Sequence, residues 1–199
     1  MTRMETFLQD LIRATLALFI VVDPLGNIPI MISLTRHLSE EERRRAFNTA
    51  SVVAFAIAII VVLGGQQLLN LFGIGMHSFM IAGGILLVFL SIKILLYGEW
   101  TETATAREEV GAVPIAFPLL VGPGAITTLM VFHQTSGIAV TVVSVLIVMS
   151  LIRVIFRFID SVYRILGRMG SDVVARLMAI FIASIAIEFI VEGIRHSFL

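Results

Sequence analysis

The chain has 199 residues, of which 58% are hydrophobic and 14% are charged, and it contains no cysteine. Soluble domains average about 45–50% apolar and about 25% charged residues, so this composition is that of a membrane protein. The lack of cysteine excludes disulfides, thiolate metal sites and cysteine nucleophiles. The 14 basic and 14 acidic residues balance, which leaves no broad cationic field for nucleic acid.

Six apolar runs are long enough to cross a hydrocarbon core, which takes about 20 helical residues. They cover residues 9–35, 46–71, 76–97, 111–133, 138–157 and 173–194. The first run continues to Leu34 and is followed by no A-x-A-like cleavage site, so we expect it to remain as a membrane helix. The expected fold class is therefore an all-α membrane protein with six transmembrane helices.

Basic residues gather on one side of the expected spans. With six spans, the first, third and fifth connections share a side, and they hold all of the 14 lysine and arginine residues except Arg3, Arg13 and Arg195. Positive charge is retained on the cytoplasmic side of membrane proteins. We therefore expect a multi-pass protein of the cytoplasmic (inner) membrane, with both termini on the non-cytoplasmic side.

The first connection contains a helix start signal. Residues 39–42 read SEEE, the pattern of a capping box, in which Ser39 accepts a main-chain amide and Glu42 reaches back to the start of the helix. Two of these acids stand four residues before Arg44 and Arg45, an order that favours ion pairs along a helix. We expect these residues to solvate the cytoplasmic start of the second span.

The fifth connection carries a polar stripe. Arg153, Arg157, Asp160 and Arg164 recur at helical spacing in an otherwise apolar segment. Such a stripe usually anchors a helix at anionic headgroups, where long basic side chains extend toward water. A regulatory or lipid-specific role is the alternative interpretation.

The chain divides into two halves of similar pattern. Residues 98–110 are polar and acidic and lack the residues that build a core, so we interpret them as a cytoplasmic linker. Residues 1–97 and 111–199 then hold three spans each, and in each half proline and glycine interrupt the first span. Because three is odd, the second half would cross in the opposite sense, as an inverted repeat. Paired interruptions of this kind indicate a central transport site.

The two interruptions are expected at the same depth. Asp23 lies fourteen residues into its span and Pro123 twelve into its own, which places both roughly 20 Å along a helix, near the middle of the bilayer. Proline removes an amide donor, so each interruption begins a new half-helix with free amides, and two such ends form a site for a carboxylate. The expected substrate-binding residues are Asp23, Pro24, Gly26, Asn27, Gly122, Pro123, Gly124, Thr127 and Thr128.

The first interruption also has a structural interpretation. A single break is more often a kink than a site, although two breaks at matched positions favour a site. Asp23 is expected to cap a half-helix that begins at Pro24. It is also a candidate for binding substrate or a coupling ion, because an acid within the membrane is costly and usually functional.

Three other polar residues leave alternatives open. Thr127 and Thr128 follow the second break, where they either donate to freed carbonyls or line a pocket. Glu188 lies within the sixth span. It is a second candidate for proton coupling, and the alternative is an ion pair with Arg195 or Arg13 near the outer surface.

The motifs and their order resemble those of one known family. DPLGNIPI (23–30), FGI (72–74), IAGGIL (81–86), IAFPLLVGPGAI (115–126), RLM (176–178) and IEFIVEGI (187–194) closely resemble the MarC family of integral membrane proteins, over essentially the whole chain. That family is similar to the LysE-type amino-acid exporters, and some relatives are regarded as transporters of glycine and alanine. The resemblance implies a transporter of small neutral amino acids. The family name refers to multiple antibiotic resistance, a role that no motif here indicates.

We therefore expect a secondary transporter of a small solute. The expected partners are a small-molecule substrate and the lipid bilayer, without nucleic acid. No cofactor is expected, although coupling to H⁺ or Na⁺ is compatible with Asp23 and Glu188. Catalysis is not expected, because the chain has no phosphate loop and no H-E-x-x-H metal motif. The alternatives are a passive channel or facilitator for small polar solutes, and a membrane protein that holds a partner without transporting.

Overall fold

The computed structural model describes residues 3–35, 38–97 and 115–198, and the chain in these ranges forms helices and no strands. In chain order the elements are α1 (Arg3–Val22), α2 (Ile28–Thr35), α3 (Glu40–Leu71), α4 (Met76–Tyr97), η1 (Ile115–Leu120), α6 (Pro123–Arg157) and α7 (Ile159–Phe198). The prediction of an all-α fold is confirmed. The predicted linker, residues 98–110, lies outside the described residues.

Within the described residues, four helices are long and apolar enough to cross a membrane. They are Glu40–Leu71, Met76–Leu96, Pro123–Arg157 and Met169–Ser197. The sequence predicted six spans, and the difference arises in two places. The first predicted span is divided between α1 and α2, and the fourth and fifth predicted spans meet within α6.

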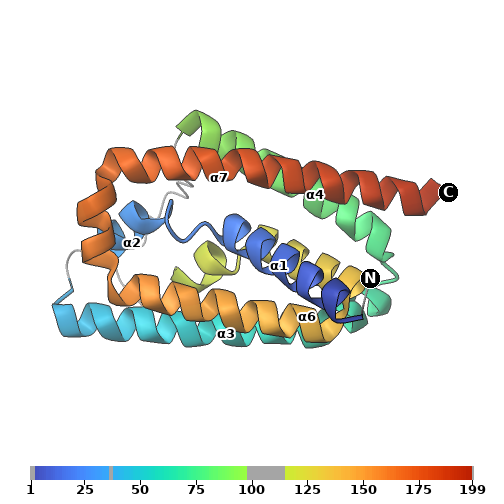
Figure 1. Cartoon of the computed structure of the whole chain (residues 1–199), viewed down its shortest axis with the longest axis horizontal. Helices are drawn as coiled ribbons and strands as arrows, with labels where there is room; N and C mark the ends of the chain where they lie inside the picture. Colours follow the sequence, from blue (N-terminus) through green and yellow to red (C-terminus); the bar gives the residue numbers. More distant parts are fainter. Residues whose placement is uncertain (1–2, 36–37, 98–114, 199) are drawn as a thin grey trace.

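α6 changes direction at Gly137, which has the non-helical torsion angles φ 85° and ψ 167°. Glycine adopts positive φ at little cost because it has no Cβ. In Figure 1 the segment of α6 before this point, in yellow, and the segment after it, in orange, run in opposite directions. The change of direction falls at the short turn that the sequence predicted between the fourth and fifth spans.

α3 begins at the predicted capping box. The Ser39 hydroxyl accepts the main-chain amide of Glu42 at 3.3 Å, and the Glu42 carboxylate accepts the amide of Ser39 at 2.8 Å. These two bonds satisfy amides that the first turn of a helix leaves free. Arg45 pairs with Glu41 at 2.6 Å. The expected pair to Arg44 is not formed within the described residues.

The long helices pack in antiparallel pairs. α4 lies along α7, α3 lies along the orange part of α6, and α1 also packs against α6 (Figure 1). The rings of Phe47 and Phe156 stack with centroids 4.7 Å apart between α3 and α6. A Cβ added at Gly84 would lie 2.7 Å from the carbonyl oxygen of Ala186, so the glycine allows α4 to approach α7 closely.

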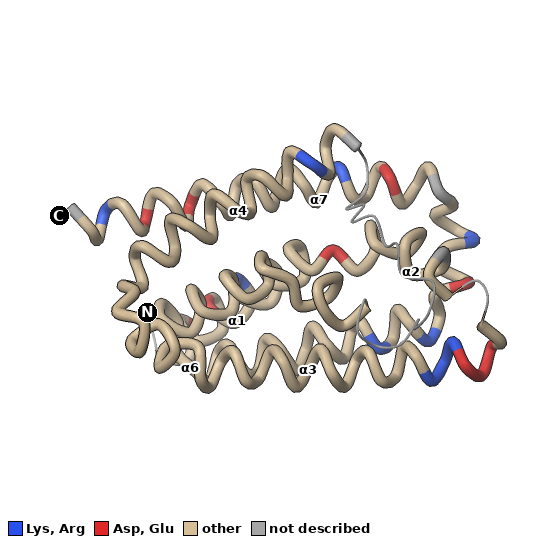
Figure 2. Tube along the Cα trace, turned by 180° about the vertical axis from the view of Figure 1, so that it is seen from behind, with Lys and Arg blue, Asp and Glu red and all other residues tan. Residues whose placement is uncertain are grey.

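Charged residues gather at the ends of the helices, while large apolar side chains face outward between them. Figure 2 shows acids and arginines at the start of α3 and more arginines at the adjacent end of α6. Exposed apolar side chains occur on every long helix, among them Ile60, Phe89, Leu146 and Ile187. Exposed apolar side chains along a long helix are what a membrane span presents to lipid.

Candidate functional site

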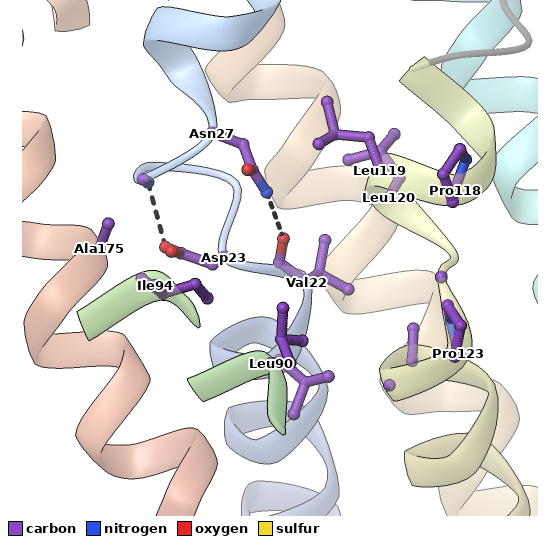
Figure 3. A pocket seen from close by; sticks show the side chains of 15 residues that line it. Val22, Asp23, Asn27, Leu90, Ile94, Pro118, Leu119, Leu120, Pro123 and Ala175 are labelled. Carbon is purple, nitrogen blue, oxygen red and sulfur yellow. Dashed lines mark hydrogen bonds between the residues drawn. The ribbon is translucent and has the colours of Figure 1, made fainter. Parts of the chain in front are cut away.

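The two interruptions meet at one cavity. Its volume is about 60 Å³, and Figure 3 shows it between the first break, the second break, α4 and α7. The lining residues are Val21, Val22, Asp23, Gly26, Asn27, Leu90, Ile94, Pro118, Leu119, Leu120, Gly122, Pro123, Gly124, Ala125 and Ala175. Two segments about 100 residues apart in sequence, each expected to be a break in a span, therefore share one space.

The first break is a turn closed by its own polar groups. α1 ends at Val22, Asp23 adopts φ +43°, and the Asp23 carboxylate accepts the main-chain amide of Gly26 at 3.0 Å. The side-chain amide of Asn27 donates to the carbonyl oxygen of Val22 at 3.0 Å. These bonds satisfy groups that leave the helical pattern at the break.

This geometry corrects one detail of the sequence interpretation. The second half-helix was expected to begin at Pro24, but α2 begins at Ile28. Asp23 still caps the turn, because its carboxylate accepts the amide three residues on. The turn between Asp23 and Ile28 arises because the positive φ of Asp23 directs the chain away from a helical path.

Asp23 is a buried acid with spare acceptor capacity. Its exposed fraction is 5%, and among the described residues its partner is the amide of Gly26. No arginine, lysine or histidine of the described residues forms an ion pair with it. An ionised carboxylate accepts about four hydrogen bonds. One wall of the cavity therefore offers a carboxyl group with unused acceptor sites.

The second break begins a long helix with free amides. Gly122 is the N-cap of α6, Pro123 occupies the first turn, and no side chain caps this end. The amide of Ile126 bonds to the carbonyl of Gly122 at 3.0 Å, whereas the amides of Gly124 and Ala125 find no acceptor in the described part of the chain. A helix N-terminus with free amides attracts an anionic group.

Glycine allows the walls of this cavity to approach closely. A Cβ at Gly26 would lie 2.8 Å from the Cβ of Ala175 and would also clash with the carboxylate of Asp23. A Cβ at Gly124 would lie 2.7 Å from Cδ2 of Leu87 and 3.0 Å from Cγ1 of Val21. Both glycines therefore set the distance between helices as well as line the cavity.

The two threonines after the second break bond to the main chain of their own helix, α6, and do not line the cavity. The hydroxyl of Thr127 donates to the carbonyl of Pro123, and that of Thr128 donates to the carbonyl of Gly124, each at 2.9 Å. Both side chains are buried, and neither lines the cavity. Of the two interpretations left open by the sequence, this geometry favours bonds to the main chain.

Pro24 and Glu188 also do not line the cavity. Glu188 is exposed on α7 and forms no ion pair within the described residues. Arg195, one of its two expected partners, lies 3.5 Å from Glu192 instead. The structure therefore brings six of the nine predicted binding residues to one cavity, namely Asp23, Gly26, Asn27, Gly122, Pro123 and Gly124.

Several lining residues were not predicted as site residues. Leu90 and Ile94 of α4 and Ala175 of α7 complete the wall (Figure 3). They are ordinary apolar residues of apolar helices, so no signal in the sequence marks them. Pro118 stood within a matched motif, although no site role was predicted for it. Among the described residues, no cluster of three or more histidine, aspartate or glutamate side chains is arranged to hold a metal.

Long apolar helices, an outward apolar surface and a small cavity between two broken helices define an integral, multi-pass membrane protein. The chain belongs to the MarC family of integral membrane proteins, whose model matches residues 8–198. It is 40% identical to a UPF0056 membrane protein of Archaeoglobus fulgidus, over 90% of this chain and 89% of that protein. It is 34% identical to the UPF0056 membrane protein YhcE of Escherichia coli, over 92% and 91% of the two chains. No solved structure matches the chain.

Proposed function

We propose that this protein is a secondary transporter that carries a small neutral amino acid of the glycine or alanine class. The observation that supports this proposal most strongly is the shared cavity. It has Asp23 on one wall and the uncapped start of α6 on another (Figure 3). A transporter needs a site that binds the solute and that opens alternately to each side of the membrane. It does not need the reacting groups that an enzyme needs.

The polar groups of the cavity complement a zwitterion. The substrate carboxylate would accept the free amides of Gly124 and Ala125, which the dipole of α6 makes favourable for negative charge. The substrate ammonium group would donate to the unused acceptor sites of Asp23. The carboxylate of Asp23 is also the candidate site for a coupling H⁺ or Na⁺. Opposite ends of one molecule would thus bind opposite walls.

The size of the cavity supports a small substrate. A buried water needs about 10–15 Å³ of comparable space, so a cavity of about 60 Å³ holds a few water molecules or a solute of a few heavy atoms. Leu90 and Ile94 provide an apolar wall against which a hydrogen or methyl side chain fits. Larger side chains would require the walls to move apart.

The arrangement of helices supports six crossings in two inverted repeats. α4 with α7, and α3 with the second part of α6, run antiparallel and pack against each other (Figure 1), as helices related by an axis in the membrane plane would. Both ends of the described chain lie at the same end of the molecule, as an even number of crossings requires. The protein would lie in the inner membrane with its arginine-rich end in the cytoplasm. Both termini would then lie on the non-cytoplasmic side.

Uptake by purified protein in proteoliposomes tests this proposal against its two alternatives. Labelled alanine should accumulate above its external concentration when an inward H⁺ or Na⁺ gradient is imposed, and the accumulation should collapse when an ionophore dissipates that gradient. Equilibration without accumulation would favour a channel or facilitator. The absence of flux, together with recovery of a stoichiometric complex on gentle extraction, would favour a protein that holds a partner.

A further inference from the structure

A second and larger cavity lies at the arginine-rich end of the helices. Its volume is about 630 Å³, within the range of about 300–1,000 Å³ that is usual for small-molecule sites. It lies between the first turns of α3, the last turns of α6 and the start of α7. The solute cavity described above shares none of its lining residues.

The lining of this cavity is strongly positive. Four guanidinium groups and two carboxylates line it, those of Arg43, Arg44, Arg153, Arg157, Glu40 and Asp160. Arg43 and Asp160 pair at 2.5 Å, which joins α3 to α7. Arg44, Arg153 and Arg157 form no ion pair with any described residue. Two positive charges are therefore in excess, and three of the guanidinium groups donate no hydrogen bond to the part of the chain that the structure describes.

Arg44, Arg153 and Arg157 are exposed, and the fold gathers them around one cavity. The arginines come from two helices more than 100 residues apart in sequence, and the packing of α3 on α6 brings them together. Buried Phe47 and Phe156, whose rings stack, form an apolar part of the wall. Like charges gathered over an apolar wall repel one another, and a bound anion relieves that repulsion.

We propose that this cavity binds a phosphate group, supplied either by the headgroup of an anionic phospholipid or by free phosphate. Guanidinium groups bind phosphate through paired N–H donors. The two excess positive charges exceed the single negative charge of a phosphodiester headgroup and match the charge of about −2 on a phosphate monoester or inorganic phosphate. Asn48 and Ser150 add neutral donors to the same wall. Val154 also lines the cavity and is 55% exposed, so an acyl chain attached to the phosphate would have apolar surface to follow.

Thermal unfolding of the whole purified protein tests the proposal without reference to transport. One arm titrates inorganic phosphate against chloride at equal ionic strength, in a neutral detergent. The other compares nanodiscs of pure phosphatidylcholine with nanodiscs that contain phosphatidic acid or phosphatidylglycerol. We expect a higher Tm in at least one arm. Stabilisation by inorganic phosphate would identify free phosphate as sufficient, and stabilisation by anionic lipid alone would identify the headgroup.

Matched double variants separate a site from general surface charge. Arg153→Gln with Arg157→Gln removes two charges from the cavity, and Arg45→Gln with Arg164→Gln removes two from outside its lining. The first pair should weaken the apparent affinity for the effective probe about tenfold or more. The second should change it by less than about twofold. Equal losses in both pairs, or no stabilisation by either probe, would overturn the proposal.

Discussion

The side-chain amide of Asn27 donates a 3.0 Å hydrogen bond to the main-chain carbonyl of Val22, and so joins the end of α1 to the start of α2 across the first break. The carbonyl of Val22 belongs to the last residue of α1, where helical partners are no longer available. The bond therefore fixes the direction in which the chain leaves the break, and with it the position of Asp23.

We expect Asn27→Ala to lower the free energy of unfolding by about 1–3 kcal/mol, because it leaves the Val22 carbonyl without its partner. The measurement is thermal unfolding of the purified protein in detergent. Asn70→Ala is the control, since the bond from Gln66 to Asn70 is exposed and should contribute little. Equal Tm values for the two variants would contradict a structural role for the Asn27 bond.

Gly124→Ala should destabilise the start of α6 by about 1–3 kcal/mol, because the new methyl group would overlap Leu87 and Val21. Gly64→Ala is the matched control, since a Cβ at Gly64 in α3 meets no atom within 4 Å. There the alanine should be neutral or stabilising by up to about 1 kcal/mol. Leu87 is fully buried, so Leu87→Ala is itself destabilising, but it also makes room for the new methyl group. The double variant should therefore lose less than the sum of the two single losses, and strict additivity would contradict the proposed overlap.

Thr128→Val should leave the KM of transport within about twofold of the native value. The hydroxyl of Thr128 donates to the carbonyl of Gly124 within the helix, and the residue does not line the cavity. Concentration-dependent uptake in proteoliposomes supplies the measurement. A KM raised about tenfold at unchanged protein stability would show instead that the threonine contacts the substrate, as the sequence left open.

Single-cysteine labelling tests whether α6 crosses the membrane twice. The native chain has no cysteine, so each introduced thiol reports one position. Glu41→Cys should react with an impermeant maleimide only from the cytoplasmic side, and Gln134→Cys, beside the change of direction at Gly137, should react only from the outside. If α6 crossed once, Gln134 would lie about 17 Å along it, within the bilayer, and would not react.

The sequence was most informative where the signal was local. The start of α3 could be predicted at Ser39 because a capping box depends on residues three apart. Both breaks could be predicted because proline and glycine disrupt a helix wherever they occur in its interior. The bounds of α2 were less accurate, since the positive φ of Asp23 depends on how the whole turn closes.

The remaining features depend on packing between distant segments. The sequence placed Glu188 within a span but did not indicate which face of α7 carries it, and in the structure it is exposed and does not line the cavity. Leu90, Ile94 and Ala175 resemble every other apolar residue of their helices until α4 and α7 are placed around the breaks. The pairing of Arg43 with Asp160 joins residues 117 apart, which no local pattern indicates.

Counterflow in proteoliposomes tests the central claim most directly, with the native protein compared with Asp23→Asn. Asparagine keeps a side-chain oxygen for the amide of Gly26 and tolerates positive φ, so it preserves the turn while removing the charge. Vesicles loaded with unlabelled glycine, alanine, serine or threonine should transiently accumulate trace labelled alanine through the native protein, and the variant should reduce that accumulation about tenfold or more. Undiminished counterflow in the variant would reduce Asp23 to a structural cap. The absence of counterflow with all four amino acids would contradict the assignment as their carrier.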